Sequence, residues 1–392
     1  MQKEILINVE SQEKRVAVVE GGVLQDYYIE RPSEVTMVGN IYKGIVNSVV
    51  SGIGAAFVDI GQGKNGFLYV SDMLMPPREF DVLDDEKTPQ PQPKRVPRPR
   101  PSEINKLVKE KQEVLVQVVK EPMGNKGPRL TTHIGIPGRF LVLMPFDQHI
   151  GISKKVRDRT ERSRLYKILK KVEPSVKMGL IVRTAGVGKS ERDIIREAKY
   201  LSALWRRIKR DSSRVKPLQI VHEEHGLTFR ILRDIFSEDI TRVLVDNRDE
   251  YKKLRHFANN MMPLMKRKLM FYKERISLFD SRGIEKDIEK LYNKKIQLKC
   301  GGYIFIEETE GLIAIDVNSG SFSRKGMEET AFKVNSEAAA EIARQMRMRD
   351  IGGIVIIDFI DMKYDTHSRN IFNILVGAVK RDKARIKLLR MS

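Results

Sequence analysis

Leu312-Ile313-Ala314-Ile315-Asp316-Val317-Asn318 is an apolar run with an aspartate where a strand should end. A second run of the same kind is Gly353-Ile354-Val355-Ile356-Ile357-Asp358-Phe359-Ile360-Asp361. A helical pattern from about Glu328 to Arg349 lies between the two runs. A strand, a crossover helix and a second strand predict a parallel pair, whose carboxyl ends meet at one edge of a sheet. We therefore expect Asp316 and Asp358 to lie side by side in an α/β domain.

These two acids, together with Asn318, form a candidate metal site. Two ionised carboxylates at close range repel each other, so a site that holds both usually contains a cation or a shared proton. Carboxylate and amide oxygens suit Mg²⁺, which keeps several waters and can activate one of them for attack on phosphorus. The alternative is that each acid only caps the turn after its strand, and the residues alone leave both interpretations open.

The charge of the chain favours a polyanionic partner. Among 392 residues, 72 are Lys or Arg and 52 are Asp or Glu, which gives a formal net charge of +20. Such an excess predicts attraction to phosphate backbones and salt-dependent binding. A basic surface without a specific ligand is the alternative interpretation.

Cysteine use and hydropathy limit the class of protein. Cys300 is the single cysteine, which excludes an internal disulfide framework and a Cys-rich zinc cluster within one chain. No run of about 18 apolar residues occurs, so no membrane span is expected. The first residues do not form a secretory signal, and we expect a cytoplasmic protein.

Short strands punctuated by glycine predict a small β-barrel between Gly39 and about Lys120. Residues 76–103 interrupt the pattern and hold many of the 16 prolines, so we expect a loop there. Phe57, Phe67 and Tyr69 lie on the expected barrel strands. Rings on a barrel face can stack RNA bases, but the pattern alone favours rings that fill the barrel core.

A second candidate site follows the expected strand at Gly179–Val182, where Arg183-Thr184 precedes Ala185-Gly186-Val187-Gly188-Lys189-Ser190. The end of this segment resembles a P-loop, but Arg183 stands where the first glycine of that motif is required. A guanidinium, a hydroxyl and turn amides can instead converge on one phosphate. A helix start preceded by an ordinary surface arginine explains the residues equally well.

Several motifs, taken in order, resemble the ribonuclease E/G family. Those of the catalytic half are Ile315–Ser319, Glu328–Phe332, Glu341–Gln345, Arg349–Gly353 and Ile357–Met362. Gly179–Gly188 resembles the family's sensor for a 5′-monophosphate, and Ala55–Asp59 with Gly66–Leu68 resembles its S1-like RNA-binding barrel. The resemblance covers nearly the whole chain.

The resemblance implies an α/β multidomain fold. An RNase H-like scaffold is split by an inserted S1-like OB barrel and a 5′ sensor, and a DNase I-like catalytic domain follows. The implied boundaries are 1–35 and 229–291 for the scaffold, 36–133 for the barrel with its Pro-rich insertion 76–103, 134–228 for the sensor and 292–392 for the catalytic domain.

The resemblance also implies roles for particular residues. Asp316 and Asp358 would bind the metal, Asn318 would orient the scissile phosphate, and Arg385 would lie near the active site. Arg183 and Thr184 would hold the 5′ phosphate, helped by backbone groups near Gly138 and Val142. The residues that would guide single-stranded RNA across the barrel are Phe57, Phe67 and Lys126.

The implied function is a Mg²⁺-dependent endoribonuclease, with Mn²⁺ as an alternative ion, that cleaves single-stranded RNA in RNA processing and decay and is stimulated by a 5′-monophosphate. Family members usually continue into a Cys-Pro-x-Cys zinc link that joins two subunits. The sequence ends at Ser392 without that motif. We therefore expect neither structural Zn²⁺ nor a zinc-linked dimer here, and another homo-oligomer stays open. The competing functions are a non-catalytic RNA-binding or chaperone protein and, less favoured, a DNA-directed nuclease.

Overall fold

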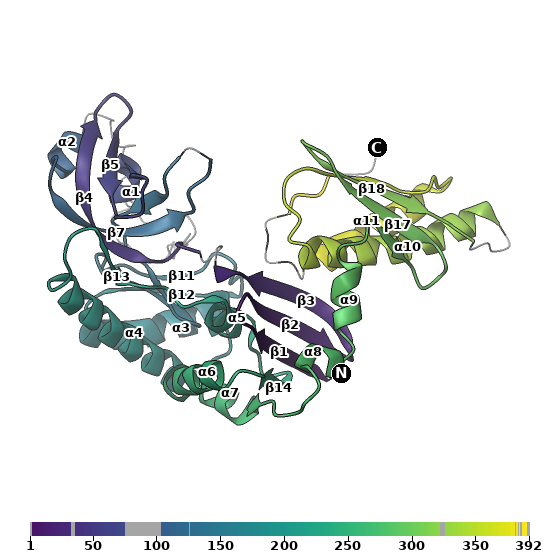
Figure 1. The fold of residues 1–392 in the computed structure, drawn as a ribbon, viewed down its shortest axis with the longest axis horizontal. Coiled ribbons are helices and arrows are strands. Elements are labelled where there is room, and N and C mark those ends of the chain that lie inside the picture. Colours follow the sequence, from purple (N-terminus) through teal and green to yellow (C-terminus); the bar gives the residue numbers. More distant parts are fainter. Residues whose placement is uncertain are drawn as a thin grey trace. The chain divides into compact units, whose positions relative to one another are not determined.

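The computed structural model describes residues 2–32, 36–74, 103–124, 126–321, 326–380, 382, 384 and 386–389. The chain forms two compact units, which are described separately (Figure 1). Unit 1 contains Met1–Arg31, Ser237–Lys253 and Arg267–Ser392, and unit 2 contains Pro32–Phe236 and Leu254–Lys266. Within the described ranges, no helix is long and apolar enough to cross a membrane.

The first sheet of unit 1 is built around β1 (Lys3–Val9), whose apolar run Ile5-Leu6-Ile7 is fully buried. The strands follow the order β15 (Leu269–Phe271), β14 (Ile240–Val245), β1, β2 (Lys14–Glu20) and β3 (Val23–Glu30). β1 is parallel to β14 and antiparallel to β2. The core beside this sheet includes residues of α8 (Leu278–Ser281) and α9 (Glu285–Lys290).

The second sheet of unit 1 carries the two aspartates. Its strands follow the order β16 (Lys295–Gln297), β17 (Tyr303–Glu308), β18 (Ile313–Asn318) and β19 (Val355–Asp358). α10 (Met327–Met348) connects β18 to β19, and these strands pair in parallel as the sequence predicts. α10 and α11 (Asp365–Val379) cover one face of this sheet (Figure 1).

α10 also contacts the first sheet of unit 1. Arg344 Nη1 donates a hydrogen bond to the carbonyl oxygen of Leu24 at 2.9 Å. Arg347 Nε donates to Asp26 Oδ1 at 2.6 Å. Both acceptors belong to the edge strand β3, so the helix that links the two aspartate strands also joins the two sheets of unit 1.

Unit 2 begins with a closed barrel, which confirms the S1-like OB barrel expected from the sequence. Around the barrel the order is β4 (Ile41–Val50), β5 (Ala55–Asp59), β6 (Gly66–Tyr69), β8 (Arg129–Thr131) and β7 (Glu113–Lys120). β7 pairs with both β8 and β4, and this second pairing closes the barrel. β13 (Gln219–His222) adds to β4, and the short helices α1 (Val70–Leu74) and α2 (Ile104–Leu107) flank the barrel core.

The rest of unit 2 is a mixed α/β layer. Its sheet follows the order β11 (Ile150–Ile152), β12 (Gly179–Val182), β10 (Leu141–Met144) and β9 (Ile136–Pro137). The helices of this region are α3 (Arg159–Val176), α4 (Glu191–Ser212) and α5 (Leu227–Ile235). The boundary between the units falls within α6 (Arg248–Met261) and within α7 (Pro263–Lys268). Ser190 caps α4 by accepting a hydrogen bond from the Asp193 amide, which fits the helix start predicted there.

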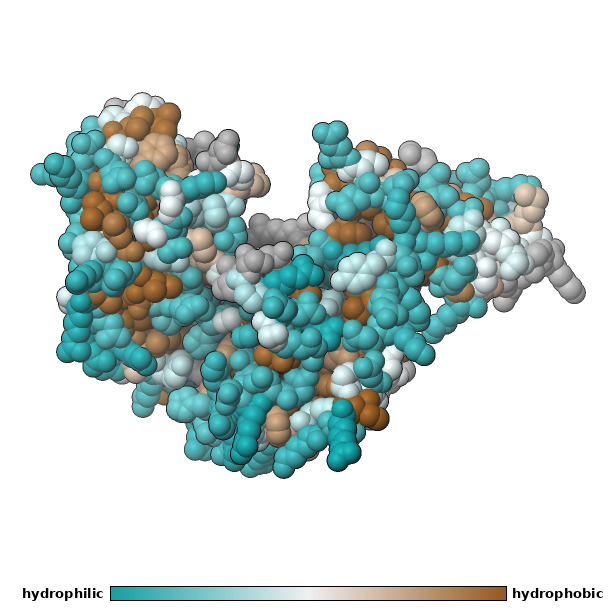
Figure 2. Space-filling view, in the orientation of Figure 1, coloured by the Kyte–Doolittle hydropathy of each residue, from teal (hydrophilic) through white to brown (hydrophobic). Residues whose placement is uncertain are grey.

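Hydrophilic residues cover most of the face drawn in Figure 2, as expected for a chain in which 32% of residues are charged. An exception lies at the edge strand β19. Ile354 is 65% exposed and Ile356 is 53% exposed. This edge of the second sheet in unit 1 therefore presents apolar side chains next to Asp358.

Candidate active site and RNA-binding surfaces

Asp316 and Asp358 lie directly opposite each other in the parallel ladder of β18 and β19. In β18, Ile315 and Val317 are buried in the core, so Asp316 between them points to the open face of the sheet. Asp358 is exposed as well. Because neighbouring strands lie about 4.8 Å apart, the two carboxylates are close enough to share one cation.

Asn318 stands two residues after Asp316 on the same face of β18. Its Nδ2 donates a hydrogen bond to Asp316 Oδ2 at 2.6 Å. This bond orients the Asp316 carboxylate through its Oδ2 atom. Asn318 can therefore set the geometry of the site without adding charge.

The donor set formed by these three residues fits a hard divalent cation. Mg²⁺ is commonly bound through one or two carboxylates and completes its octahedral shell with water or phosphate oxygen. Within the described residues, no group of three or more His, Cys, Asp or Glu is clustered for metal binding. A cation at the acid pair would therefore keep several positions for water and substrate.

Aromatic side chains border the acid pair on the other side of β18. Phe305 of β17 is the register partner of Asp316, and Tyr303 is the register partner of Asn318. Lys295 Nζ lies 3.8 Å from the centroid of the Tyr303 ring. The acids thus stand on an open face that also carries half-buried rings and a lysine.

Arg183 directly follows β12, and its guanidinium is hydrogen-bonded and ion-paired through one of its nitrogens. Its Nη1 donates to the carbonyl oxygen of Gly138 at 2.5 Å and forms an ion pair with Asp234 Oδ1 at 2.9 Å. In the part of the chain that the structure describes, Nε and Nη2 have no partner. Two such parallel donors can bind two oxygens of one anion at once.

Thr184 is exposed at the start of the 3-10 turn Thr184–Gly186. Its hydroxyl has no partner among the described residues, and it follows Arg183 immediately. Gly138 is buried behind the guanidinium. Val142 is also buried, in β10, where it packs with Met144 and Ile181. The structure therefore brings Arg183, Thr184 and the Gly138 carbonyl together. The backbone of Val142 lies in β10, paired with Ile181 and Pro137, and its role in the site stays a prediction.

Phe57 and Phe67 lie on the outside of the barrel, whereas Tyr42 is buried in its core and Tyr69 packs against that core. Phe57 and Phe67 are register partners on β5 and β6, and their ring centroids are 5.8 Å apart. Both are half-buried, whereas their neighbours Val58 and Leu68 are fully buried in the core. The interpretation that these rings fill the barrel core is wrong, because the strand alternation assigns the inward positions to the aliphatic residues.

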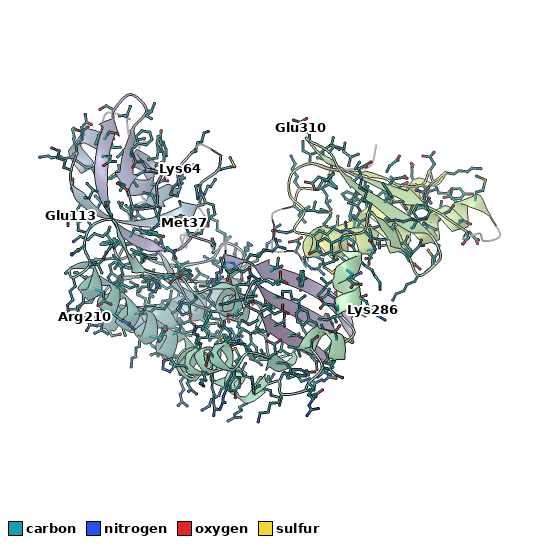
Figure 3. All side chains as sticks on the ribbon, viewed as in Figure 1. Met37, Lys64, Glu113, Arg210, Lys286 and Glu310 are labelled. Carbon is teal, nitrogen blue, oxygen red and sulfur yellow. The ribbon has the colours of Figure 1, made fainter. Side chains whose placement is uncertain are left out.

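Lys126 lies in the loop between β7 and β8 and is exposed. Lys64, labelled on the barrel in Figure 3, donates to the carbonyl oxygen of Gly124 at 2.7 Å. The Phe67 amide donates to the carbonyl oxygen of Pro128 at 2.8 Å. These bonds fix the Lys126 loop beside the strand that carries Phe67, so the rings and lysines share one part of the barrel.

Comparison with known proteins shows the family of the chain. The model of the ribonuclease E/G family matches residues 135–392, and the model of the S1 RNA binding domain matches residues 36–133. The chain belongs to the ribonuclease E/G family. Ribonuclease G of Salmonella typhimurium (strain SL1344) is 38% identical over 389 residues, which are 99% of this chain and 77% of that protein.

Two further relatives extend the comparison of this ribonuclease E/G family member. Ribonuclease G of Escherichia coli (strain K12) is 38% identical over 386 residues, which are 98% of this chain and 76% of that protein. Ribonuclease E of the same strain is 40% identical over 397 residues, which cover 100% of this chain and 36% of that protein.

The predicted site residues of this ribonuclease E/G chain fall into local groups. The acid pair and Asn318 form one group in unit 1, and the sensor residues and the barrel residues form two groups in unit 2. Arg385 lies outside the described residues, as does the Pro-rich segment 76–103 apart from Glu103. The role of Arg385 stays a prediction.

Three buried or half-buried residues near the candidate sites were not identified from the sequence. Asn335 of α10 is fully buried and forms two hydrogen bonds with Ile360, just after Asp358. Asp234 pairs with Arg183, and Glu197 of α4 binds the backbone behind it. The signal that could have found Asn335 and Glu197 is a polar residue on the apolar face of an amphipathic helix.

Proposed function

We propose that this ribonuclease of the E/G family cleaves single-stranded RNA endonucleolytically with Mg²⁺ and prefers substrates with a 5′-monophosphate, in RNA processing and decay. The observation that carries the proposal is the register of Asp316 with Asp358 on the open face of the sheet. A basic chain with an S1 barrel supplies the RNA-binding surface that such an activity needs.

Asp316 and Asp358 would together hold the cation. Asn318 keeps Asp316 in a fixed orientation through its 2.6 Å hydrogen bond. When bound, Mg²⁺ would supply Lewis acidity to the phosphate and lower the pKa of a bound water. The exposed position of both carboxylates lets a single strand approach from the open side of the sheet.

The sensor would favour a terminal phosphate over a terminal hydroxyl. The Nε and Nη2 donors of Arg183 and the hydroxyl of Thr184 are available to one phosphate group. A 5′-hydroxyl end leaves these donors without a charged partner, and a triphosphate brings additional bulk and charge. The preference should therefore appear mainly in substrate binding.

We also propose the domain assignments that the resemblance implies, with an RNase H-like scaffold at 1–35 and 229–291, the sensor at 134–228 and a DNase I-like catalytic domain at 292–392. The sheet order β15–β14–β1–β2–β3 of unit 1 supports a scaffold built from both segments, because β14 and β1 pair directly.

Replacing either acid tests the proposed chemistry. Asp316→Asn and Asp358→Asn should each lower cleavage of a defined single-stranded oligonucleotide by about 100-fold or more, because each removes a negative ligand that would hold the cation needed at the reacting phosphate. RNA affinity should change little. Rates are measured with Mg²⁺ and with a chelator, and affinity is measured by fluorescence anisotropy.

Asp361→Asn is the matched control, since Asp361 is an exposed acid outside the register pair. Near wild-type cleavage by both acid variants, or cleavage that persists in chelator, would contradict the proposed site. Binding without any magnesium-dependent cleavage by the wild-type chain would favour the non-catalytic RNA-binding alternative.

A further inference from the structure

Glu197 is a buried carboxylate that the proposed chemistry does not use. It lies on the apolar face of α4 with Ile194, Ala198 and Leu201, and only 4% of its surface is exposed. Burying a charged group is unfavourable unless hydrogen bonds replace its water. The partners of this carboxylate therefore indicate why the helix carries it.

The carboxylate of Glu197 binds the backbone between β9 and β10. The Phe140 amide donates to Oε1 at 3.0 Å and to Oε2 at 3.1 Å, and the Leu141 amide donates to Oε1 at 3.4 Å. Successive backbone amides that converge on one anion form a nest. In this nest the anion is supplied by the protein itself.

The same backbone segment holds the sensor arginine. The Gly138 carbonyl oxygen accepts from Arg183 Nη1, and the Phe140 carbonyl oxygen accepts from the Arg183 amide at 2.7 Å. Gly138 leaves no room for a side chain, because a Cβ there would lie 1.9 Å from Glu197 Oε1. Residues 138–141 therefore connect Glu197 on one side with Arg183 on the other.

We propose that Glu197 is a positioning residue of the 5′-phosphate sensor, whose carboxylate holds residues 138–141 so that Arg183 presents its Nε and Nη2 donors to the substrate. The inference deepens the proposed sensor and rests on it. Glu197 does not touch the RNA, and its effect passes through the Gly138 carbonyl and the Phe140 backbone.

The protonation of Glu197 offers a readout that packing alone would not give. Burial raises the pKa of Glu197 to about 7, although the backbone hydrogen bonds and the nearby Arg183 act in the opposite direction. Arg183 is the charged side chain whose field acts on the Glu197 carboxylate. Asp234 forms ion pairs with both Arg183 and Arg233. A protonated carboxyl accepts fewer hydrogen bonds. Glu197 should therefore hold residues 138–141 less firmly below pH 7.

The Glu197→Gln variant tests the inference, since it keeps the shape of the side chain and removes its charge and one acceptor oxygen. Cleavage of two oligonucleotides that differ only in a 5′-phosphate or 5′-hydroxyl end is measured with the full chain and Mg²⁺. The KM for the phosphorylated substrate should rise by about tenfold, as for one lost hydrogen bond to a charged group. The kcat of both substrates and the KM of the hydroxyl substrate should stay unchanged.

The pH profile separates positioning from simple packing. In the wild type, the preference for the phosphorylated substrate should rise with pH through a step near 7. The phosphate itself ionises near pH 6, and that step should appear in every variant. Glu197→Gln should retain the step near 6 and lose the one near 7. Glu191→Gln, in the first turn of the same helix, is the matched control and should resemble the wild type. Glu191 is half-buried and pairs with Lys171, away from residues 138–141.

Superimposable profiles of the wild type and Glu197→Gln, or an unchanged KM, would overturn the inference. If Glu197→Gln does not fold, the pH profile of the wild type tests the inference alone. A wild-type profile that shows only the step near pH 6 contradicts the inference. Arg183→Ala distinguishes failure of the positioning role of Glu197 from failure of the proposed sensor. Loss of the 5′ preference in Arg183→Ala but not in Glu197→Gln rejects the positioning role alone, and no loss in either rejects the sensor itself.

Discussion

Arg183 shows how single side chains prepare an anion site. Gly138 and Asp234 both contact Nη1, so the opposite edge of the guanidinium stays open toward solvent. The side chain of Arg183 is 31% exposed and that of Asp234 is 25% exposed. At the proposed phosphate site, Asp234 would therefore have two opposed effects: it would orient the arginine, and its negative charge would repel the ligand.

Asp234→Asn separates these two effects. The amide oxygen can still accept from Nη1, while the negative charge beside the phosphate disappears. We expect the KM for 5′-monophosphorylated RNA to fall by about threefold, since partly exposed charges at this range contribute up to about 1 kcal/mol. Arg183→Ala should instead raise that KM toward the value for 5′-hydroxyl RNA. A rise of the KM in Asp234→Asn would mean that orientation outweighs repulsion.

At the scale of secondary structure, α10 positions the acid pair. The helix supplies apolar residues to the core beneath β18 and β19. Its buried Asn335 also holds the chain just beyond Asp358: Nδ2 donates to the Ile360 carbonyl oxygen at 2.8 Å, and Oδ1 accepts from the Ile360 amide at 3.1 Å. One helix thereby sets both the pairing of the strands and the exit of the chain from β19.

Asn335→Leu should uncouple the helix from the end of β19. The change leaves the amide and the carbonyl of Ile360 without partners, which should lower the free energy of unfolding by about 2 kcal/mol or more. Cleavage should fall at temperatures where the protein is still folded, because Asp358 is less well placed. Chemical denaturation and initial rates measure the two effects. Ala340→Ser, on the exposed face of α10, should alter neither, and equal behaviour of the two variants would argue against this role for Asn335.

At the scale of the whole molecule, charge and stacking should contribute to RNA binding in separable ways. The net charge of +20 is spread along a chain whose visible surface is largely hydrophilic (Figure 2). The barrel adds a localised group of rings, in which Phe67 stacks on Tyr69 with centroids 6.2 Å apart. The contribution of charge to RNA affinity depends on salt concentration, and the contribution of base stacking does not.

Salt titrations of RNA binding should resolve the two contributions. Lys126→Gln should make the slope of log affinity against log salt shallower by about 0.7, the value for one phosphate contact on a single strand. Phe67→Leu should lower affinity by about 1 kcal/mol, because a stacked base is lost, and should leave the slope unchanged. Identical changes of slope in both variants would show that the ring does not act by stacking.

The sequence by itself determined the alternation of apolar and polar residues, and with it the strand–helix–strand unit that brings Asp316 and Asp358 together. Local periodicity is sufficient there, because a parallel crossover allows few arrangements. The start of α4 and the existence of the barrel were also predictable, since capping residues and glycine turns act over a few positions.

Only the tertiary structure decided which face of the barrel carries Phe57 and Phe67, because a run of apolar strand residues does not reveal which side is buried. It also decided the partners of Arg183. Its partners Gly138 and Asp234, and Glu197 behind Gly138, come from three separate segments of the chain, and their contacts depend on long-range packing that no local pattern encodes. The physical reason is the same in both cases: local propensities fix backbone conformation, whereas burial and charge pairing are settled when distant segments meet.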